Sequence, residues 1–219
     1  MRVAIFDFDG TLYSKETFQL MMEHLKTHPV HSKRYRQFYR AIMPPYIGSK
    51  LKLVSVKKMR EQSVQAYLAA LESFTKPELE TYFSEIADKM HGDFNPAVVE
   101  RLKQHVHDND YVMLVSGAFT PLLHAVTEKL PIGTIIGTEI PYAGNILDLK
   151  AKISHIQGPL KTEKIKEALS GQDIDWPNSY AYGDSLSDLP VLELVGHPVA
   201  VQPEPSLRTV AKERNWEIL

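Results

Sequence analysis

The sequence predicts an α/β fold, in which a doubly wound parallel sheet carries an inserted α-helical domain. Strand-length apolar runs alternate with helical patterns at the start of the chain and throughout its second half, which is typical of a parallel sheet flanked by helices. Residues 14–91, by contrast, show helical spacing and no strand pattern. We therefore expect residues 1–13 and 92–219 to form the sheet domain and residues 14–91 to form the helical domain.

The expected strands are short apolar runs that end in turn residues or lead into helical patterns. They are Val3–Phe8, Tyr111–Val115, Thr134–Gly137, Tyr180–Tyr182 and Val199–Val201. The segment IPYAGNILDLK places Gly-Asn between apolar residues, which predicts a small hairpin beside the sheet. Within the helical domain, Pro44-Pro45 predicts a break between two helices.

Composition excludes several classes of protein. The 219 residues include no cysteine, so disulfides and thiolate metal sites are excluded. No stretch approaches the roughly 18 apolar residues of a membrane-spanning helix. The apolar run after Met1 is only a strand's length before it meets Asp7, which does not match a signal peptide. We expect a cytoplasmic protein.

Charge is distributed unevenly along the chain, although the net charge is only −2. The segment from Lys26 to Arg60 contains ten Lys or Arg and no Asp or Glu. It is interpreted as a solvated helical face, or functionally as a surface that steers an anionic substrate, attracts an anionic membrane or contacts nucleic acid. Of the functional readings we expect steering, and we expect no nucleic-acid partner.

Three histidines, His24, His28 and His31, lie close together at the start of this segment. Imidazole nitrogens are common metal ligands, but no acidic residue joins these three in the sequence. A metal site is therefore not expected there.

Polar motifs follow the predicted strands or begin helices at four places: DFDGT (7–11), VSGAF (115–119), GPLKTEKI (158–165) and YGDSLSD (182–188). Each alone fits an ordinary turn or helix cap. Together they lie where a parallel sheet binds ligands, at the carboxyl ends of its strands. The first motif ends a buried run with two carboxylates, whose repulsion requires a cation or a proton to offset it.

The four stretches resemble motifs one to four of the haloacid dehalogenase superfamily of phosphohydrolases. Their order, the helical insertion after the first and the sequence GDSLSDLPVLELVGHPVAV resemble the phosphoserine-phosphatase-like branch. The resemblance covers the expected sheet domain and implies a haloacid-dehalogenase-like core with an inserted helical cap. It further implies a Mg²⁺-dependent phosphomonoesterase that works through an aspartyl-phosphate intermediate.

Four aspartates take roles from this resemblance. Asp7 matches the nucleophile, and Asp9 matches the acid that protonates the leaving oxygen and then activates water. The resemblance implies that Mg²⁺ is held by Asp7, by the backbone carbonyl of Asp9 and by Asp184. Asp188, one helical turn beyond Asp184, matches a supporting or alternative metal ligand.

Donors for the phosphate oxygens are also implied. Ser116 matches the hydroxyl of the second motif, with the Gly117 amide beside it at an expected helix start, where backbone N–H groups favour an anion. Gly10 and Thr11 are expected to contribute similarly.

Two further residues carry open alternatives. Lys161 and Lys164 both qualify as the lysine of the third motif, and the spacing from Gly158 favours Lys161. Glu16 stands where phosphoserine phosphatases place a glutamate that reads the substrate's amino group, or it is simply an acidic residue at a helix start.

The expected substrate is a small phosphorylated metabolite, either phosphoserine or a related phosphate monoester. A phosphomutase of the same fold and a non-catalytic module that binds phosphate or lipid phosphate are the alternatives. A dehalogenase is disfavoured because it has no use for Asp9 as a leaving-group acid. The sequence leaves the oligomeric state open.

Overall fold

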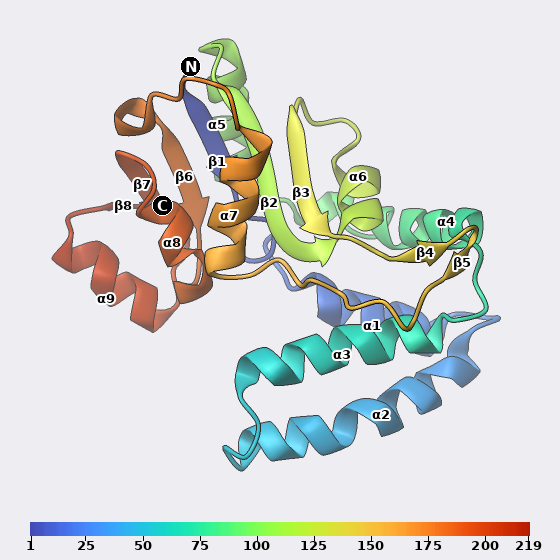
Figure 1. Ribbon diagram of the computed structural model, residues 1–219. Helices are drawn as coiled ribbons and strands as arrows, with labels where there is room; N and C mark the ends of the chain where they lie inside the picture. Colours follow the sequence, from blue (N-terminus) through green and yellow to red (C-terminus); the bar gives the residue numbers. More distant parts are fainter. The chain divides into compact units, whose positions relative to one another are not determined.

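The computed structural model describes the backbone of residues 1–219 and every side chain except that of Lys57 (Figure 1). The chain divides into two compact units. The sheet unit comprises Met1–Glu16, Ala87–Thr138 and Ile156–Leu219, and the helical unit comprises Thr17–Ile86 and Glu139–His155. The chain therefore leaves the sheet unit at two separate places.

A parallel sheet forms the centre of the sheet unit, as predicted, and it has six strands instead of the five expected. Its strands, in spatial order, are β3 (Thr134–Thr138), β2 (Tyr111–Phe119), β1 (Val3–Phe6), β6 (Tyr180–Gly183), β7 (His197–Ala200) and β8 (Glu217–Ile218). All of β1 is buried, as expected for a central strand covered on both faces. Strand β1 ends at Phe6, two residues before the predicted end, so that Asp7 is the first residue beyond it.

Helices cover both faces of this sheet (Figure 1). Val3 and Ile5 of β1 point into one apolar core, which contains buried residues of the helices on that face. Phe6 points to the other face, where its ring stacks on Tyr182 at 4.4 Å and meets the edge of His105. The helices of this unit are α5 (Pro96–His107), α6 (Thr120–Thr127), α7 (Pro159–Ala168), α8 (Leu189–Leu192) and α9 (Pro205–Glu213), with 3₁₀ turns at His91–Asp93, Trp176–Asn178 and Leu186–Asp188.

The helical unit contains α1 (Thr17–Thr27), α2 (Ser32–Lys50), α3 (Val56–Ala70) and nearly all of α4 (Lys76–Ala87). Its core is rich in aromatic side chains. The hydroxyl of Tyr67 contacts that of Tyr82 at 2.8 Å and donates to the carbonyl oxygen of Met21 at 3.0 Å. These bonds satisfy two phenol groups that would otherwise be costly to bury.

The predicted hairpin forms, and it belongs to the helical unit. Strands β4 (Tyr142–Ala143) and β5 (Ile146–Leu147) pair with each other, and segment Glu139–His155 belongs to the helical unit. The Lys76 N–H donates to the carbonyl oxygen of Asn145 at 2.8 Å, and Gln65 Nε2 donates to that of Leu149 at 3.1 Å. These hydrogen bonds connect the hairpin to the helical unit. The Gly-Asn turn in the sequence does not reveal them, because their partners are far away in the chain.

The expected break at Pro44-Pro45 is wrong, because both prolines lie inside α2. Each removes one backbone N–H from the helical ladder, which usually disrupts a helix. Helix α2 packs against both α1 and α3, and this packing outweighs the local preference. The chain turns instead after Lys50.

No helix among the described residues is long and apolar enough to cross a membrane.

Candidate active site

The predicted site residues all come from the sheet unit. Asp7 follows β1 and Asp184 follows β6, and these two strands are hydrogen-bonded neighbours. Asp188 ends the 3₁₀ turn after β6, and Lys161 lies in the first turn of α7. Strand order therefore brings together residues that are up to 181 positions apart in the sequence, from Asp7 to Asp188.

Three carboxylates converge at this end of the sheet. One oxygen each of Asp7, Asp184 and Asp188 lies within 4.8 Å of the other two. The Lys161 ammonium lies among them, with Nζ 2.5 Å from Asp7 Oδ1 and 2.6 Å from Asp188 Oδ1. Asp7, Lys161 and Asp188 are buried. One buried cation therefore faces three carboxyl groups.

The pKa values of these groups reflect the imbalance. Burial raises the pKa of Asp7 well above its ordinary value, and the charge of Asp188 raises it further, while Lys161 acts in the opposite direction. Burial, followed by the charges of Asp188 and Glu16, raises the pKa of Asp184 to about 7. Burial lowers the pKa of Lys161, but the charges of Asp188 and Asp7 outweigh it and raise that pKa overall.

The donor set fits a hard divalent cation. Mg²⁺ prefers oxygen ligands, and carboxylates crowded to this degree carry more negative charge than one ammonium can offset. Gly10 leaves the space that Asp184 occupies, since a Cβ on Gly10 would lie 2.5 Å from Asp184 Oδ2. Gly10 also has a φ of 73°, which favours glycine. In the structure this glycine thus admits a carboxylate, a role that the sequence did not suggest.

Asp188 is held by protein donors on both oxygens. Oδ1 accepts from Lys161, and Oδ2 accepts from the Ser185 hydroxyl at 2.9 Å and from the Ser185 N–H at 3.2 Å. Gly183 lacks a side chain where a Cβ would lie 2.6 Å from the Cβ of Asp188. Sequence reasoning missed Ser185, although its position three residues before an acidic residue is the spacing of a capping box.

The two candidate lysines of α7 have different surroundings. Lys161 is buried against Asp7 and Asp188, whereas the partly exposed Lys164 pairs with Glu167 at 2.6 Å. Gly158, the residue before α7, has a φ of 54°. Of these two lysines, Lys161 is the one that contacts the aspartates.

Ser116 and Gly117 do not lie at a helix start as expected. Both are inside β2, where the pairing with β3 shifts register between Val115 and Phe119, and α6 begins only at Thr120. Ser116 Oγ is buried and accepts from the Ala118 N–H at 3.1 Å. The extended strand replaces the helix start because pairing with β3 continues to Phe119.

The loop after Asp7 contains the remaining predicted residues. The Gly10 N–H donates to the carbonyl oxygen of Lys15 at 3.3 Å, and the Thr11 N–H donates to that of Phe8 at 3.2 Å. Among the described carboxylates, that of Asp9 is not part of the converging group. Glu16 is exposed, and its charge acts on Asp184.

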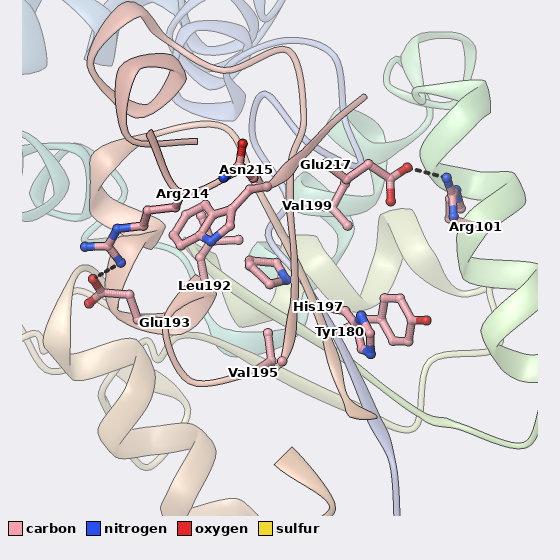
Figure 2. Close-up of a pocket in the computed structure, with 13 residues that line it drawn as sticks. Arg101, Tyr180, Leu192, Glu193, Val195, His197, Val199, Arg214, Asn215 and Glu217 are labelled. Atoms are coloured by element: carbon pink, nitrogen blue, oxygen red, sulfur yellow. Dashed lines mark hydrogen bonds and ion pairs between the residues drawn. The ribbon is translucent and has the colours of Figure 1, made fainter. Parts of the chain in front are cut away.

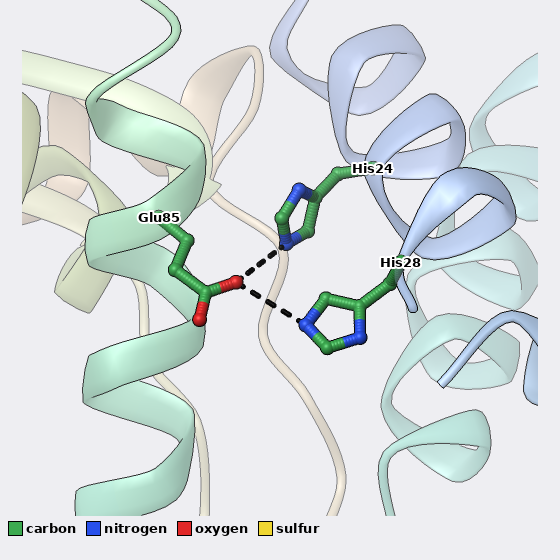
Figure 3. A group of neighbouring side chains, drawn as sticks. All are labelled: His24, His28 and Glu85. Carbon is green, nitrogen blue, oxygen red and sulfur yellow. Dashed lines mark hydrogen bonds and ion pairs between the residues drawn. The ribbon is translucent and has the colours of Figure 1, made fainter. Parts of the chain in front are cut away.

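The histidine group differs from the sequence interpretation, because an acidic residue does join it. Glu85 of α4 lies 3.3 Å from His24 Nε2 and 3.2 Å from His28 Nε2 (Figure 3). The Nδ1 atom of His28 accepts the N–H groups of Val30 and His31, both at 3.1 Å. In the neutral ring the proton is then on Nε2, which donates it to Glu85 and is not available to a metal. We interpret the group as a hydrogen-bonded contact between helices.

A cavity of about 680 Å³ lies in the sheet unit near the amino ends of β6 and β7 (Figure 2). Arg101 pairs there with Glu217, and Arg214 pairs with Glu193. Both cations therefore already face carboxylates, and the cavity is at the opposite end of the strands from the aspartate group.

Comparisons with known proteins identify the family and support the fold. A family model described as haloacid dehalogenase-like hydrolase matches residues 4–193. The histidinol-phosphatase of Neisseria meningitidis serogroup C (strain 8013) is 26% identical over an alignment 239 residues long, gaps included. The alignment covers 99% of this chain and 97% of that protein. A phosphoserine phosphatase of Mycobacterium tuberculosis is 27% identical over 152 residues, which cover 69% of this chain.

The alignment covers only 49% of that mycobacterial protein, so this chain matches about half of its length. Among solved structures, a protein of unknown function from Bordetella pertussis Tohama I superposes with a TM-score of 0.83 at 22% identity. The superposition covers 100% of this chain and 97% of that one. At this identity the likeness supports the fold alone.

Replacing Lys161 is expected to destabilise the protein. Lys161→Met leaves two buried carboxylates without their shared cation, which lowers the free energy of unfolding by about 3 kcal/mol near neutral pH. Lys164→Met, three residues along the same helix, removes only an exposed ion pair and serves as the matched control. Urea denaturation of both variants without added metal measures the difference. Equal effects of the two substitutions would contradict the buried pairing.

The pH dependence of stability follows from Asp184. Its pKa rises from 3.8 to about 7 on folding, so the folded protein holds this proton where the unfolded chain has lost it. The contribution of Asp184 to stability without metal is therefore full at low pH and falls as the pH rises toward 7, by on the order of 1 to 2 kcal/mol after allowance for solvent screening. Denaturation at several pH values, with Asp184→Asn as the comparison, measures this loss. The variant should show a flatter profile, and an unchanged slope would exclude Asp184 as its source.

Proposed function

The chain belongs to the haloacid dehalogenase-like hydrolases, and from this premise we propose that it is a Mg²⁺-dependent phosphatase that hydrolyses a small phosphate monoester at Asp7. The observation that carries the proposal is the convergence of Asp7, Asp184 and Asp188, with the buried Lys161 bonded to Asp7 and Asp188. Phosphate esters hydrolyse extremely slowly in water, so a catalyst needs a nucleophile, an acid and positive charge. The group supplies the nucleophile and part of the charge.

Asp7 acts as the nucleophile. Its N–H donates to the carbonyl oxygen of Tyr182 at 3.0 Å, which fixes the residue at the end of β1. A carboxylate oxygen of Asp7 forms a bond to phosphorus as the bond to the ester oxygen breaks. Water then attacks the resulting aspartyl-phosphate, releasing inorganic phosphate and restoring the carboxylate.

Asp9 transfers the proton in both steps. It lies two residues after Asp7 in a turn that the Tyr13 N–H closes on the carbonyl oxygen of Phe8 at 2.9 Å. Asp9 first gives its proton to the leaving oxygen, and as a carboxylate it then takes a proton from the attacking water. Its carboxylate lies outside the converging group of Asp7, Asp184 and Asp188.

Positive charge and hydrogen-bond donors complete the site. Lys161 and the hydroxyl of Ser116 bind the phosphate oxygens. Asp7, Asp184 and the backbone carbonyl of Asp9 would hold Mg²⁺, which when bound offsets the repulsion between the phosphate and the carboxylates. Asp188 positions the Lys161 ammonium, while Ser185 holds Asp188 in turn.

The substrate class follows from Glu16 together with the relatives. Phosphoserine and histidinol phosphate, the substrates in the names of two related phosphatases, each carry an amino group near the phosphate. Glu16 is exposed close enough to Asp184 for its charge to raise that pKa. We therefore assign Glu16 to the amino group of an aminated phosphate monoester.

The nucleophile is tested by Asp7→Asn. Hydrolysis of p-nitrophenyl phosphate should require Mg²⁺, stop on chelation, and fall at least about 100-fold in this variant. Asp173→Asn, an exposed position in the same unit, is the control and should retain full activity. If the wild type with Mg²⁺ turns over no phosphate monoester at all, the chain is instead a binding module.

Glu16 is tested by substrate comparison. Glu16→Ala should lower kcat/KM for phosphoserine or histidinol phosphate by about 10-fold or more, because the ammonium loses its charge partner. The rate with p-nitrophenyl phosphate, which has no amino group, should change by less than about 2-fold. Equal losses on all substrates would show that Glu16 supports the metal site instead.

A further inference from the structure

Large apolar side chains are exposed where α2 turns into α3. We call residues 46–56 the α2–α3 tip. Leu53 is 79% exposed and Leu51 63% exposed, and Val56, Ile47 and Tyr46 are exposed as well. The tip lies at the end of the antiparallel α2–α3 pair that is opposite to the α1–α2 connection (Figure 1). Scattered surface leucines are ordinary, but a contiguous group of this kind marks an interaction site.

The backbone of the tip is well defined. The Lys52 N–H donates to the carbonyl oxygen of Ser49 at 3.0 Å, and the Leu53 N–H donates to that of Gly48 at 2.8 Å, which is a Schellman motif. In most Schellman motifs the two residues joined by the longer hydrogen bond, here Leu53 and Gly48, also pack their apolar side chains together. Since Gly48 has no side chain, Leu53 remains outside, while Val54 turns inward against Gly48.

Cationic residues flank these apolar residues in the sequence. Lys50, Lys52, Lys58 and Arg60 are exposed, and within the described part of the chain none of them forms an ion pair. Lys52 has a φ of 59° at the position of the motif where glycine is favoured. A lysine in this conformation costs more free energy than a glycine would, so we infer that the positive charge of Lys52 has a function. No acidic residue lies between Lys26 and Arg60 in the sequence.

We propose that the α2–α3 tip docks the protein on an anionic membrane surface. Leu51, Leu53 and Val56 would enter the boundary between headgroups and acyl chains, while the flanking ammonium groups remain among the lipid phosphates. A projecting turn suits a fluid surface, whereas a protein partner would need a matching concave pocket. Steering of a small substrate, the function that the sequence favoured for this segment, requires no exposed leucines.

Vesicle sedimentation tests the proposal with the full chain. The wild type should bind vesicles of phosphatidylcholine with phosphatidylglycerol about 10-fold better than vesicles of phosphatidylcholine alone, and added salt should weaken the binding. The double variants Leu51→Ser/Leu53→Ser and Lys50→Glu/Lys52→Glu should each reduce binding at least about 5-fold. Val106→Ser and Lys129→Glu, exposed positions of the sheet unit, are the matched controls and should bind like the wild type.

Several outcomes would overturn the proposal. They are absence of binding by the wild type at low salt, undiminished binding by the leucine variant, and a concentration-dependent dimer that the leucine variant abolishes while vesicles bind nothing. Hydrolysis of p-nitrophenyl phosphate should be the same in all four variants. The docking surface and the phosphatase activity can therefore fail independently.

Discussion

Three carboxyl groups face one buried ammonium at the carboxyl ends of β1 and β6, and the surrounding structure serves this arrangement. Burial makes the repulsion among the carboxylates strong, because little water screens it. Lys161 offsets part of the repulsion, while burial first and the charge of Asp188 second raise the pKa values of Asp7 and Asp184. Two glycines without side chains, Gly10 and Gly183, give the aspartates room to approach. The repulsion among the carboxylates is thus a property of the fold, and the divalent cation that we propose would offset it.

The two units hold different kinds of residue. Every residue to which we assign a part in hydrolysis belongs to the sheet unit, while the exposed apolar and basic residues of the α2–α3 tip belong to the helical unit. The helical unit is itself assembled from two separate segments, since the hairpin at Glu139–His155 packs with the helices. Chemistry and surface attachment can accordingly be altered by separate substitutions.

Sequence patterns were sufficient to predict the structure where residues close together in the chain determine it. The apolar run before Asp7 and the turn at Gly10 located the end of a strand, and the spacing from Gly158 selected the buried Lys161. Sequence patterns were insufficient where packing against distant segments determines the structure. Helix α2 continues through Pro44 because neighbouring helices hold it, and Glu85 meets two histidines only once α4 packs on α1. Strand β8 has just two residues and no apolar pattern, so pairing with β7 alone defines it.

The central position of β1 has a consequence for how the protein is made. Val3 pairs with Tyr111 on one side, and Ala4 pairs with Tyr180 on the other, so the first strand to be synthesised has partners that appear only much later. Contacts this distant in sequence slow folding and leave an apolar strand exposed in the meantime. Helices α1 to α4 can form before either partner exists, whereas Asp7 meets Asp184 only when β6 has left the ribosome. The aspartate group is therefore among the last parts of the nascent chain to assemble.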